Sequence, residues 1–182
     1  YELMTELAER SPTGANKLLF NPSLAGGSSQ EPNADIRGAF SGLDLGHTRG
    51  DIIRAGMEGI AMNLGFVLEV LKRFSSLSNE MVIVGGGSKN SLWRQIFADV
   101  FNMNMVKTNI GEEAGSLGAA AIAAVGCGLW KDFSIVDQVH QVESIAEPIS
   151  ENTEIYKKLV PMYEMLRKTQ AEIGKALHQI SI

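Results

Sequence analysis

Residues 80–95 form the most informative stretch of the chain, and they read Glu80-Met81-Val82-Ile83-Val84-Gly85-Gly86-Gly87-Ser88-Lys89-Asn90-Ser91-Leu92-Trp93-Arg94-Gln95. A short apolar run rich in β-branched residues indicates a buried strand, the glycines indicate a tight loop, and a helical pattern follows directly. Glycine has no Cβ and reaches positive φ, so the backbone of Gly85, Gly86 and Gly87 can approach a ligand closely. Ser88 or Asn90 is suited to cap the next helix, whose first amides would face the same space and favour an anion. The stretch therefore predicts a phosphate or nucleotide site.

The same glycines also have a simpler interpretation as a plain connection between a strand and a helix. Their spacing is neither G-x-x-x-x-G-K-[ST] nor G-x-G-x-x-G, so the signatures of P-loop and dinucleotide-binding proteins are absent. On the loop alone, both interpretations stay open.

The composition is that of a globular protein acting on small molecules. With 182 residues, 45% of them hydrophobic, the chain can form one well-packed domain, alone or within a larger protein. The net charge of −5 and the lack of a basic cluster argue against nucleic acid or an anionic membrane as partner. The single cysteine, Cys127, excludes an internal disulfide, suits the cytoplasm, and is interpreted as a small buried hydrophobe. His47, His140 and His178 are scattered, so no metal-ligand spacing exists.

Two segments bear on how complete the chain is and on whether it enters a membrane. The chain opens at Tyr1 without a Met or a signal sequence, and residues 1–8 already look like a helix interior, so we expect a fragment of a longer protein. The apolar residues 114–130 are too short and too rich in glycine for a membrane span, which favours a buried core helix.

The first half of the chain contains the clearest helix. Residues 1–10 indicate a helix, 18–22 a strand, 24–32 an exposed loop and 36–45 a strand interrupted by glycine. Thr48 followed by Asp51 is a variant of the capping box and starts a helix over residues 49–74. Arg54 and Glu58 are four residues apart and could form an ion pair, which would contribute only a few tenths of a kcal/mol if it is exposed, while Gly56 and Gly59 suggest close packing. The expected buried face consists of Ile53, Met57, Ile60, Leu64, Val67 and Leu71.

The second half continues the alternation. Helices are expected over residues 90–101, from Ile110 to Val125, over 134–140 and over 152–177, with a strand at 103–107. Trp93 and Phe97 are interpreted as core residues, and Pro161 should kink or split the last helix near Val160. The expected stripe on that helix consists of Ile155, Leu159, Met162, Leu166, Ile173 and Leu177.

Alternating strands and helices place the chain in the α/β class, most simply as one domain over residues 1–182. Ligands of such sheets bind beyond the carboxyl ends of the strands, where Gly85, Gly86 and Gly87 would lie. Sequence pattern and loop chemistry therefore point to the same place.

Five ordered stretches resemble the carboxy-terminal domain of the FGGY family of carbohydrate kinases, most closely its xylulokinase branch. Together they extend over most of the chain from Leu18 to Trp130, and five matches in order are far more specific than any one of them. They are residues 18–24, residues 37–43, residues 54–61 (Arg54-Ala55-Gly56-Met57-Glu58-Gly59-Ile60-Ala61), residues 85–99 and residues 113–120 (Glu113-Ala114-Gly115-Ser116-Leu117-Gly118-Ala119-Ala120).

The resemblance implies an actin-like ATPase fold (ribonuclease H-like), in which two domains close over ATP, with Mg²⁺, and a small sugar, here xylulose. This chain would be the nucleotide-side, carboxy-terminal half, without its first strands and without the amino-terminal domain. By resemblance, Gly86 lies against the nucleotide phosphates, Asn90 reaches the adenine side, and Gly85 and Gly87 shape the loop. Glu113 and Ala114 would lie near the adenosine pocket. The family's catalytic Asp has no counterpart here, so the chain alone is expected to be inactive.

One departure from the family pattern concerns the loop after Leu24. The family usually has G-E-R-x-P there, whereas residues 26–32 read Gly26-Gly27-Ser28-Ser29-Gln30-Glu31-Pro32, without the arginine. This departure does not affect the resemblance to the family, but it bears on the assignment to the xylulokinase branch.

Two other interpretations remain beside the kinase. One is a non-catalytic actin-like module that binds nucleotide or assembles through its last helix, as a homodimer for example. The other is a nicotinamide-binding domain, which the missing G-x-G-x-x-G and its acidic partner disfavour.

Overall fold

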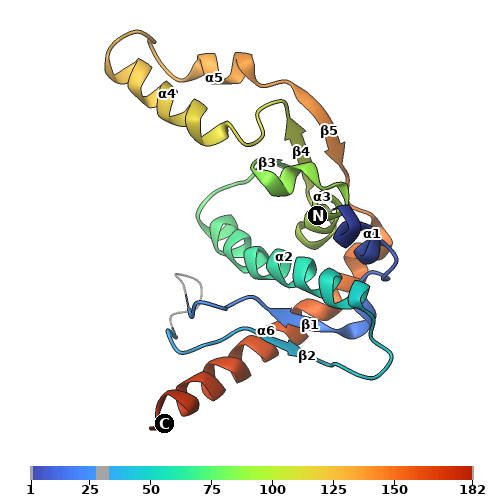
Figure 1. The fold of residues 1–182 in the computed structure, drawn as a ribbon. Helices are drawn as coiled ribbons and strands as arrows, with labels where there is room; N and C mark the ends of the chain where they lie inside the picture. The colour runs from blue at the N-terminus through green and yellow to red at the C-terminus, as the bar shows by residue number, and fades with distance from the viewer. Residues whose placement is uncertain (1, 28–32, 182) are drawn as a thin grey trace.

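The computed structural model describes residues 2–27 and 33–181, so of the departure at residues 26–32 the part from 28 to 32 lies outside the described residues. Two short 3₁₀ turns lie at Ala15–Lys17 and Gly86–Lys89. The helices and strands, drawn in Figure 1, are α1 (Glu2–Glu9), β1 (Leu19–Asn21), β2 (Ala39–Ser41), α2 (Arg49–Phe74), β3 (Glu80–Ile83), α3 (Ser91–Phe101), β4 (Asn104–Thr108), α4 (Ala114–Gly126), α5 (Ser134–Val139), β5 (Val142–Ala146) and α6 (Ser150–His178).

Two small sheets lie on either side of α2. In one sheet β3 runs parallel to β4, with Val82 opposite Val106, and β5 joins the far side of β4 antiparallel. The other is the antiparallel ribbon of β1 and β2, in which Phe20 lies opposite Phe40. The α/β prediction is confirmed, although β2 is shorter than the expected strand at residues 36–45 and β5 was not predicted.

The main core joins α2, α3 and the three-stranded sheet. Its buried side chains come from all three elements, as expected when a strand, a helix and a strand alternate. The aromatic rings of Trp93 and Phe97 stack at 5.8 Å, so both residues belong to this packing as predicted. The buried members are Ala61, Leu68, Ile96, Phe97, Ala98, Phe101, Met103 and Met105.

Strand β3 is half-exposed, which corrects the prediction of a buried strand. Met81 and Ile83 pack against the core, whereas Val82 and Val84 on the alternate face are 49% and 46% exposed. In the part of the chain that the structure describes, β3 pairs with β4 alone, so one of its edges and one of its faces are open.

Helix α4 is also far more exposed than the predicted core helix. Ala121 and Ala124 are its buried residues, and Ile122 is 68% exposed. Figure 1 shows that α4 and α5, which connect β4 to β5 along the chain, lie away from the sheet. Cys127 at the end of α4 is exposed, so its interpretation as a buried hydrophobe is wrong. Among the described residues, no helix is long and apolar enough to cross a bilayer.

The start of α2 agrees with the sequence, but its buried face does not. Thr48 and Asp51 form the reciprocal capping box. The predicted face fails at Leu64 and Leu71, which are 41% and 50% exposed. Helix α2 packs against α1, β1, α3 and α6, so these neighbours rather than apolar spacing decide which of its sides are buried.

The buried side of α2 contains the ion pair of Arg54 and Glu58, two residues that the sequence pattern placed off the apolar face. Arg54 and Glu58 are 6% and 1% exposed, with Nε and Oε1 2.7 Å apart. Glu58 also accepts hydrogen bonds from the Gly14 amide at 3.0 Å and the Tyr156 hydroxyl at 2.8 Å. Burial raises the pKa of Glu58, and Arg54 and these donors oppose that shift. The pair therefore fastens the segment after α1 to α2 and α6.

A second buried carboxylate, Asp51, holds the same segment. Its oxygens accept hydrogen bonds from the Ser11 hydroxyl at 2.6 Å, the Asn16 amide at 2.8 Å and both the amide and hydroxyl of Thr48 at 2.7 Å. Burial alone would raise the pKa of Asp51, but these donors outweigh it and lower the pKa to about 2. Because the folded-state pKa is depressed, this stabilisation is present above the ordinary pKa and is lost as the pH falls towards 2.

Helix α6 stays continuous through Pro161, so of the two predicted effects near Val160, a kink or a split, the split does not occur. Its buried face is also displaced from the predicted stripe, because Met162, Ile173 and Leu177 are exposed. Tyr156 and Tyr163 are buried instead, and Gly174 lies against the Asp35 carbonyl so closely that a Cβ would overlap it. Hydrogen bonds and close backbone contacts, rather than apolar spacing, fix how α6 lies on the domain.

The two glycines of α2 predict opposite mutational effects. A Cβ on Gly59 would overlap the Phe20 carbonyl oxygen, whereas one on Gly56 would meet no atom within 4 Å. The prediction of close packing is therefore confirmed for Gly59 and wrong for Gly56. We expect Gly56→Ala to stabilise the protein by about 1 kcal/mol through helix propensity, and Gly59→Ala to destabilise it by about 3 kcal/mol through overpacking. Denaturant titration of both variants checks this, and equal effects would contradict the packing of β1 on α2.

Candidate functional site

The loop after β3 has the sharp reversal that three glycines allow. Gly85 has φ of 82° and ψ of −175°, a conformation that residues with a Cβ rarely adopt. Its amide donates to the Gly111 carbonyl at 3.2 Å, and its carbonyl accepts from the Ser88 hydroxyl at 2.7 Å. These bonds hold the loop beside the segment that leads into α4.

The three glycines differ in whether the fold requires them to lack a side chain. Gly85 needs its backbone conformation, whereas a Cβ on Gly87 would only make an ordinary van der Waals contact, 3.4 Å from the Trp93 ring. At Gly86 the nearest atom to a built Cβ is the exposed Glu112 carboxylate oxygen, at 3.9 Å. Among the described residues nothing in the fold therefore requires glycine at Gly86, and the space in front of its backbone is open.

Asn90 caps α3, which settles the choice between Ser88 and Asn90. Its Oδ1 accepts from the Trp93 amide at 3.0 Å, while its Nδ2 donates to the Thr5 hydroxyl oxygen at 2.7 Å. Ser88 is 1% exposed and serves the loop instead. Asn90 thus connects the glycine loop, the start of α3 and α1.

A cleft of about 1020 Å³ lies between α1 and the glycine loop. That volume suits a nucleotide-sized ligand, at the upper end of the usual range for small-molecule sites. One wall comes from α1, the other from the loop and the first turn of α3. The lining residues are Glu2, Thr5, Glu6, Glu9, Gly86, Gly87, Lys89, Asn90, Ser91, Trp93 and Glu112.

The charges around the cleft are mostly negative. Four carboxylates line it, and the lining lysine, Lys89, pairs with Glu112 at 3.1 Å in an exposed contact. Solvent screens such an exposed pair strongly. An anionic ligand is therefore met by backbone amides and the dipole at the start of α3, rather than by cationic side chains of the described residues.

Three of the predicted binding residues, Gly86, Gly87 and Asn90, line the cleft directly, and Gly85 shapes the loop behind them. Glu113 and Ala114, predicted near an adenosine pocket, begin α4 directly after Glu112, which does line the cleft. The structure therefore places all six in one region without putting Glu113 or Ala114 among the lining residues.

Helix α1 is the part of the site that sequence reasoning missed. Glu2, Thr5, Glu6 and Glu9 follow the three-and-four spacing of one helix face and all line the cleft. That spacing was visible in the sequence, but a polar helix face is usually solvated. Only the packing of α1 on α2 reveals what this face meets.

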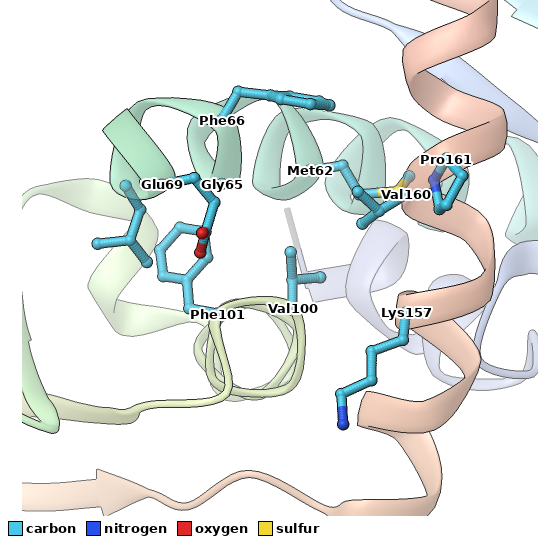
Figure 2. A pocket seen from close by; sticks show the side chains of 10 residues that line it. Met62, Gly65, Phe66, Glu69, Val100, Phe101, Lys157, Val160 and Pro161 are labelled. Carbon is cyan, nitrogen blue, oxygen red and sulfur yellow. The ribbon is translucent and has the colours of Figure 1, made fainter. Parts of the chain in front are cut away.

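A second cavity, of about 260 Å³, lies between α2, α3 and α6 at the other end of α3 (Figure 2). Its walls are apolar and include Met62, Val100, Phe101 and Val160. Glu69 and Lys157, which also line it, pair with Lys72 and Glu154 respectively. Without a group that could orient a ligand, it is interpreted as a gap between packed helices.

Across residues 2–27 and 33–181 no three His, Cys, Asp or Glu side chains converge in a way that could hold a metal ion. The cleft at the glycine loop is the candidate site because it brings together the predicted binding residues Gly86, Gly87 and Asn90.

Comparison with known proteins matches this chain to sugar kinases. Residues 1–127 match the model of the FGGY family of carbohydrate kinases, C-terminal domain. A xylulose kinase of Staphylococcus epidermidis is 37% identical over 182 residues, all of this chain and 36% of that protein. A gluconokinase of Bacillus licheniformis is 32% identical over 164 residues, 90% of this chain and 32% of that protein.

The same likeness appears among solved structures. The ligand-bound xylulose kinase from Lactobacillus acidophilus superposes with a TM-score of 0.81 at 30% identity, over 93% of this chain and 34% of that one. The chain thus spans about a third of the length of the kinases it matches.

Proposed function

The chain belongs to the FGGY family of carbohydrate kinases and has their actin-like ATPase fold, and we propose that its protein transfers the γ-phosphoryl group of ATP to a hydroxyl of a small sugar. In this proposal the described chain is the carboxy-terminal domain that binds the nucleotide. Gly85, Gly86, Gly87 and Asn90 form its binding loop, with Glu113 and Ala114 close to the nucleoside end.

The open backbone at Gly86 is the observation on which the site assignment depends. We propose that a phosphate oxygen approaches its amide, since beyond the adjacent residues the nearest atom to the position of a Cβ there is the exposed Glu112 carboxylate oxygen, at 3.9 Å. The helix that follows is capped by Asn90, so its first amides also face an anion. Phosphoryl transfer depends mainly on positioning and charge stabilisation, which such a preorganised backbone supplies.

Magnesium would enter this site with the nucleotide. The described residues offer no cluster to hold the ion, so we propose that the phosphates and groups outside this chain bind it. Mg²⁺ usually keeps several waters and binds through substrate phosphates rather than an all-protein cage. Its charge would also offset Glu2, Glu6, Glu9 and Glu112 around the cleft.

The acceptor is proposed to be xylulose, because xylulose kinases are among the most similar relatives. Gluconate is the runner-up, since gluconokinases also match at 30–32% identity. The sugar and its catalytic carboxylate are assigned to the rest of the protein. A single cysteine is consistent with a cytoplasmic location.

The rest of the protein would also complete the fold around this chain. Val82 and Val84 leave an apolar face open on β3, one edge of β3 pairs with no described strand, and Ile122 of α4 is exposed. Apolar surface and a free strand edge are both unfavourable in water. We assign their cover to strands of the same domain and to the amino-terminal domain.

A kinase assay on the full-length protein tests this proposal. With Mg²⁺ and ATP, we expect ADP formation that depends on the sugar. Among xylulose, ribulose, gluconate and glycerol, xylulose should give the highest kcat/KM. The 182-residue chain alone should be inactive, because the deprotonating carboxylate lies outside it. Nucleotide binding without transfer to any sugar would favour the non-catalytic module. Turnover by the isolated chain would refute the proposal that the catalytic carboxylate lies outside it.

A further inference from the structure

The Asn90 side chain is held at both ends by partners of known polarity. The Trp93 amide can only donate, so the atom 3.0 Å from it must be Oδ1 and the amide group cannot be flipped. This leaves Nδ2 directed at Thr5, 2.7 Å away, where the hydroxyl oxygen accepts. Both ends are thus oriented without any ligand.

The position of Thr5 is itself fixed by the packing of α1. The backbone of Leu7 lies so close to Gly50 that a Cβ on Gly50 would overlap the Leu7 carbonyl oxygen. Beyond the helix, the Ser11 carbonyl accepts from the Arg54 guanidinium at 2.8 Å. Helix α1 therefore cannot slide along α2 without breaking buried contacts.

An amide nitrogen has two hydrogens, and Thr5 takes one of them. Asn90 lines the cleft, so the remaining N–H is the polar hydrogen that it can offer to a ligand. The acceptor oxygen, in contrast, faces the backbone of α3. From this arrangement we infer that Thr5 is a positioning residue that makes Asn90 a hydrogen-bond donor at the nucleotide site, selective for an acceptor atom of the nucleoside. The inference depends on the proposed function.

The test compares Thr5→Val, which keeps the shape and removes the hydroxyl, with Thr5→Ser, which keeps the hydroxyl, in the full-length protein. Loss of one oriented hydrogen bond should raise the KM for ATP about tenfold in Thr5→Val, with kcat and the KM for the sugar unchanged. Thr5→Ser should stay within about twofold of wild type.

Thr13→Val is the matched control, because Thr13 also lies in a hydrogen-bonded position, accepting from Arg54 at 3.1 Å and donating to Asn152 at 3.0 Å. It should lower Tm without changing the KM for ATP. An unchanged KM for ATP in Thr5→Val, or equal losses in Thr5→Val and Thr5→Ser, would overturn the inference. If Thr5→Val has no effect but Gly86→Val still loses ATP binding, the role of Thr5 is wrong and the nucleotide site is still supported. The failure of this inference can therefore be told apart from the failure of the proposed function.

Discussion

Replacing Arg54 with alanine is expected to lower the free energy of unfolding by about 3–5 kcal/mol. The change leaves the Glu58 carboxylate, 1% exposed, without its cationic partner, and it leaves the Ser11 carbonyl without its donor. An exposed pair at the same i,i+4 spacing would contribute only about 0.2–0.5 kcal/mol, so the size of the loss measures burial. Chemical denaturation followed by circular dichroism gives the value.

Two further measurements make the Arg54 result specific. Lys157→Ala removes the partner of Glu154, an exposed pair at 2.6 Å, and should cost less than about 1 kcal/mol. Because the folded-state pKa of Glu58 is raised, its burial favours the protonated form, and stability falls as the pH rises through that pKa. The deficit of Arg54→Ala should accordingly shrink on acidification. A loss below about 1 kcal/mol would show that the network is solvated.

Gly86→Val should abolish nucleotide binding by the full-length protein while leaving its Tm close to wild type. The Cβ of the new side chain would lie 3.9 Å from its nearest neighbour, the exposed Glu112 carboxylate oxygen, and we expect its methyl groups to occupy the approach to the loop amides. We expect the Kd for ATP, measured by calorimetry with Mg²⁺, to rise at least about 100-fold, the effect of losing several phosphate contacts.

Neighbouring substitutions show why Gly86 is the sharpest probe. Gly85→Ala would strain a backbone at φ of 82°, so any loss of binding would mix with unfolding. Asn90→Ala would weaken binding but also remove the α3 cap, at about 1 kcal/mol. If ATP affinity survives Gly86→Val, the site assignment is wrong even though the family is not.

Local signals were enough to predict the central unit of the fold. The apolar run at Val82, the glycines, and the cap at Asn90 each act within a few residues, and the capping box at Thr48 does the same. Such features depend on backbone geometry and short-range hydrogen bonds, which the sequence encodes directly.

What failed depends on contacts that are distant in sequence. The burial of the Arg54–Glu58 pair was not visible in the sequence because Gly14 and Tyr156, which donate to Glu58, lie 44 and 98 residues from it. The cleft wall on α1 was missed for the same reason, since Thr5 and Asn90 are 85 residues apart. Helix α4 looked like a core helix from its composition, but among the described residues only Ala121 and Ala124 of this helix are buried.

A crystal structure of the full-length protein with Mg²⁺ and a non-hydrolysable ATP analogue tests the central claim most directly. The account predicts phosphate oxygens within hydrogen-bond distance of the Gly86 amide and the nucleoside directed towards Asn90 Nδ2. Well-ordered nucleotide bound elsewhere, with the loop at residues 85–90 facing solvent, would contradict it.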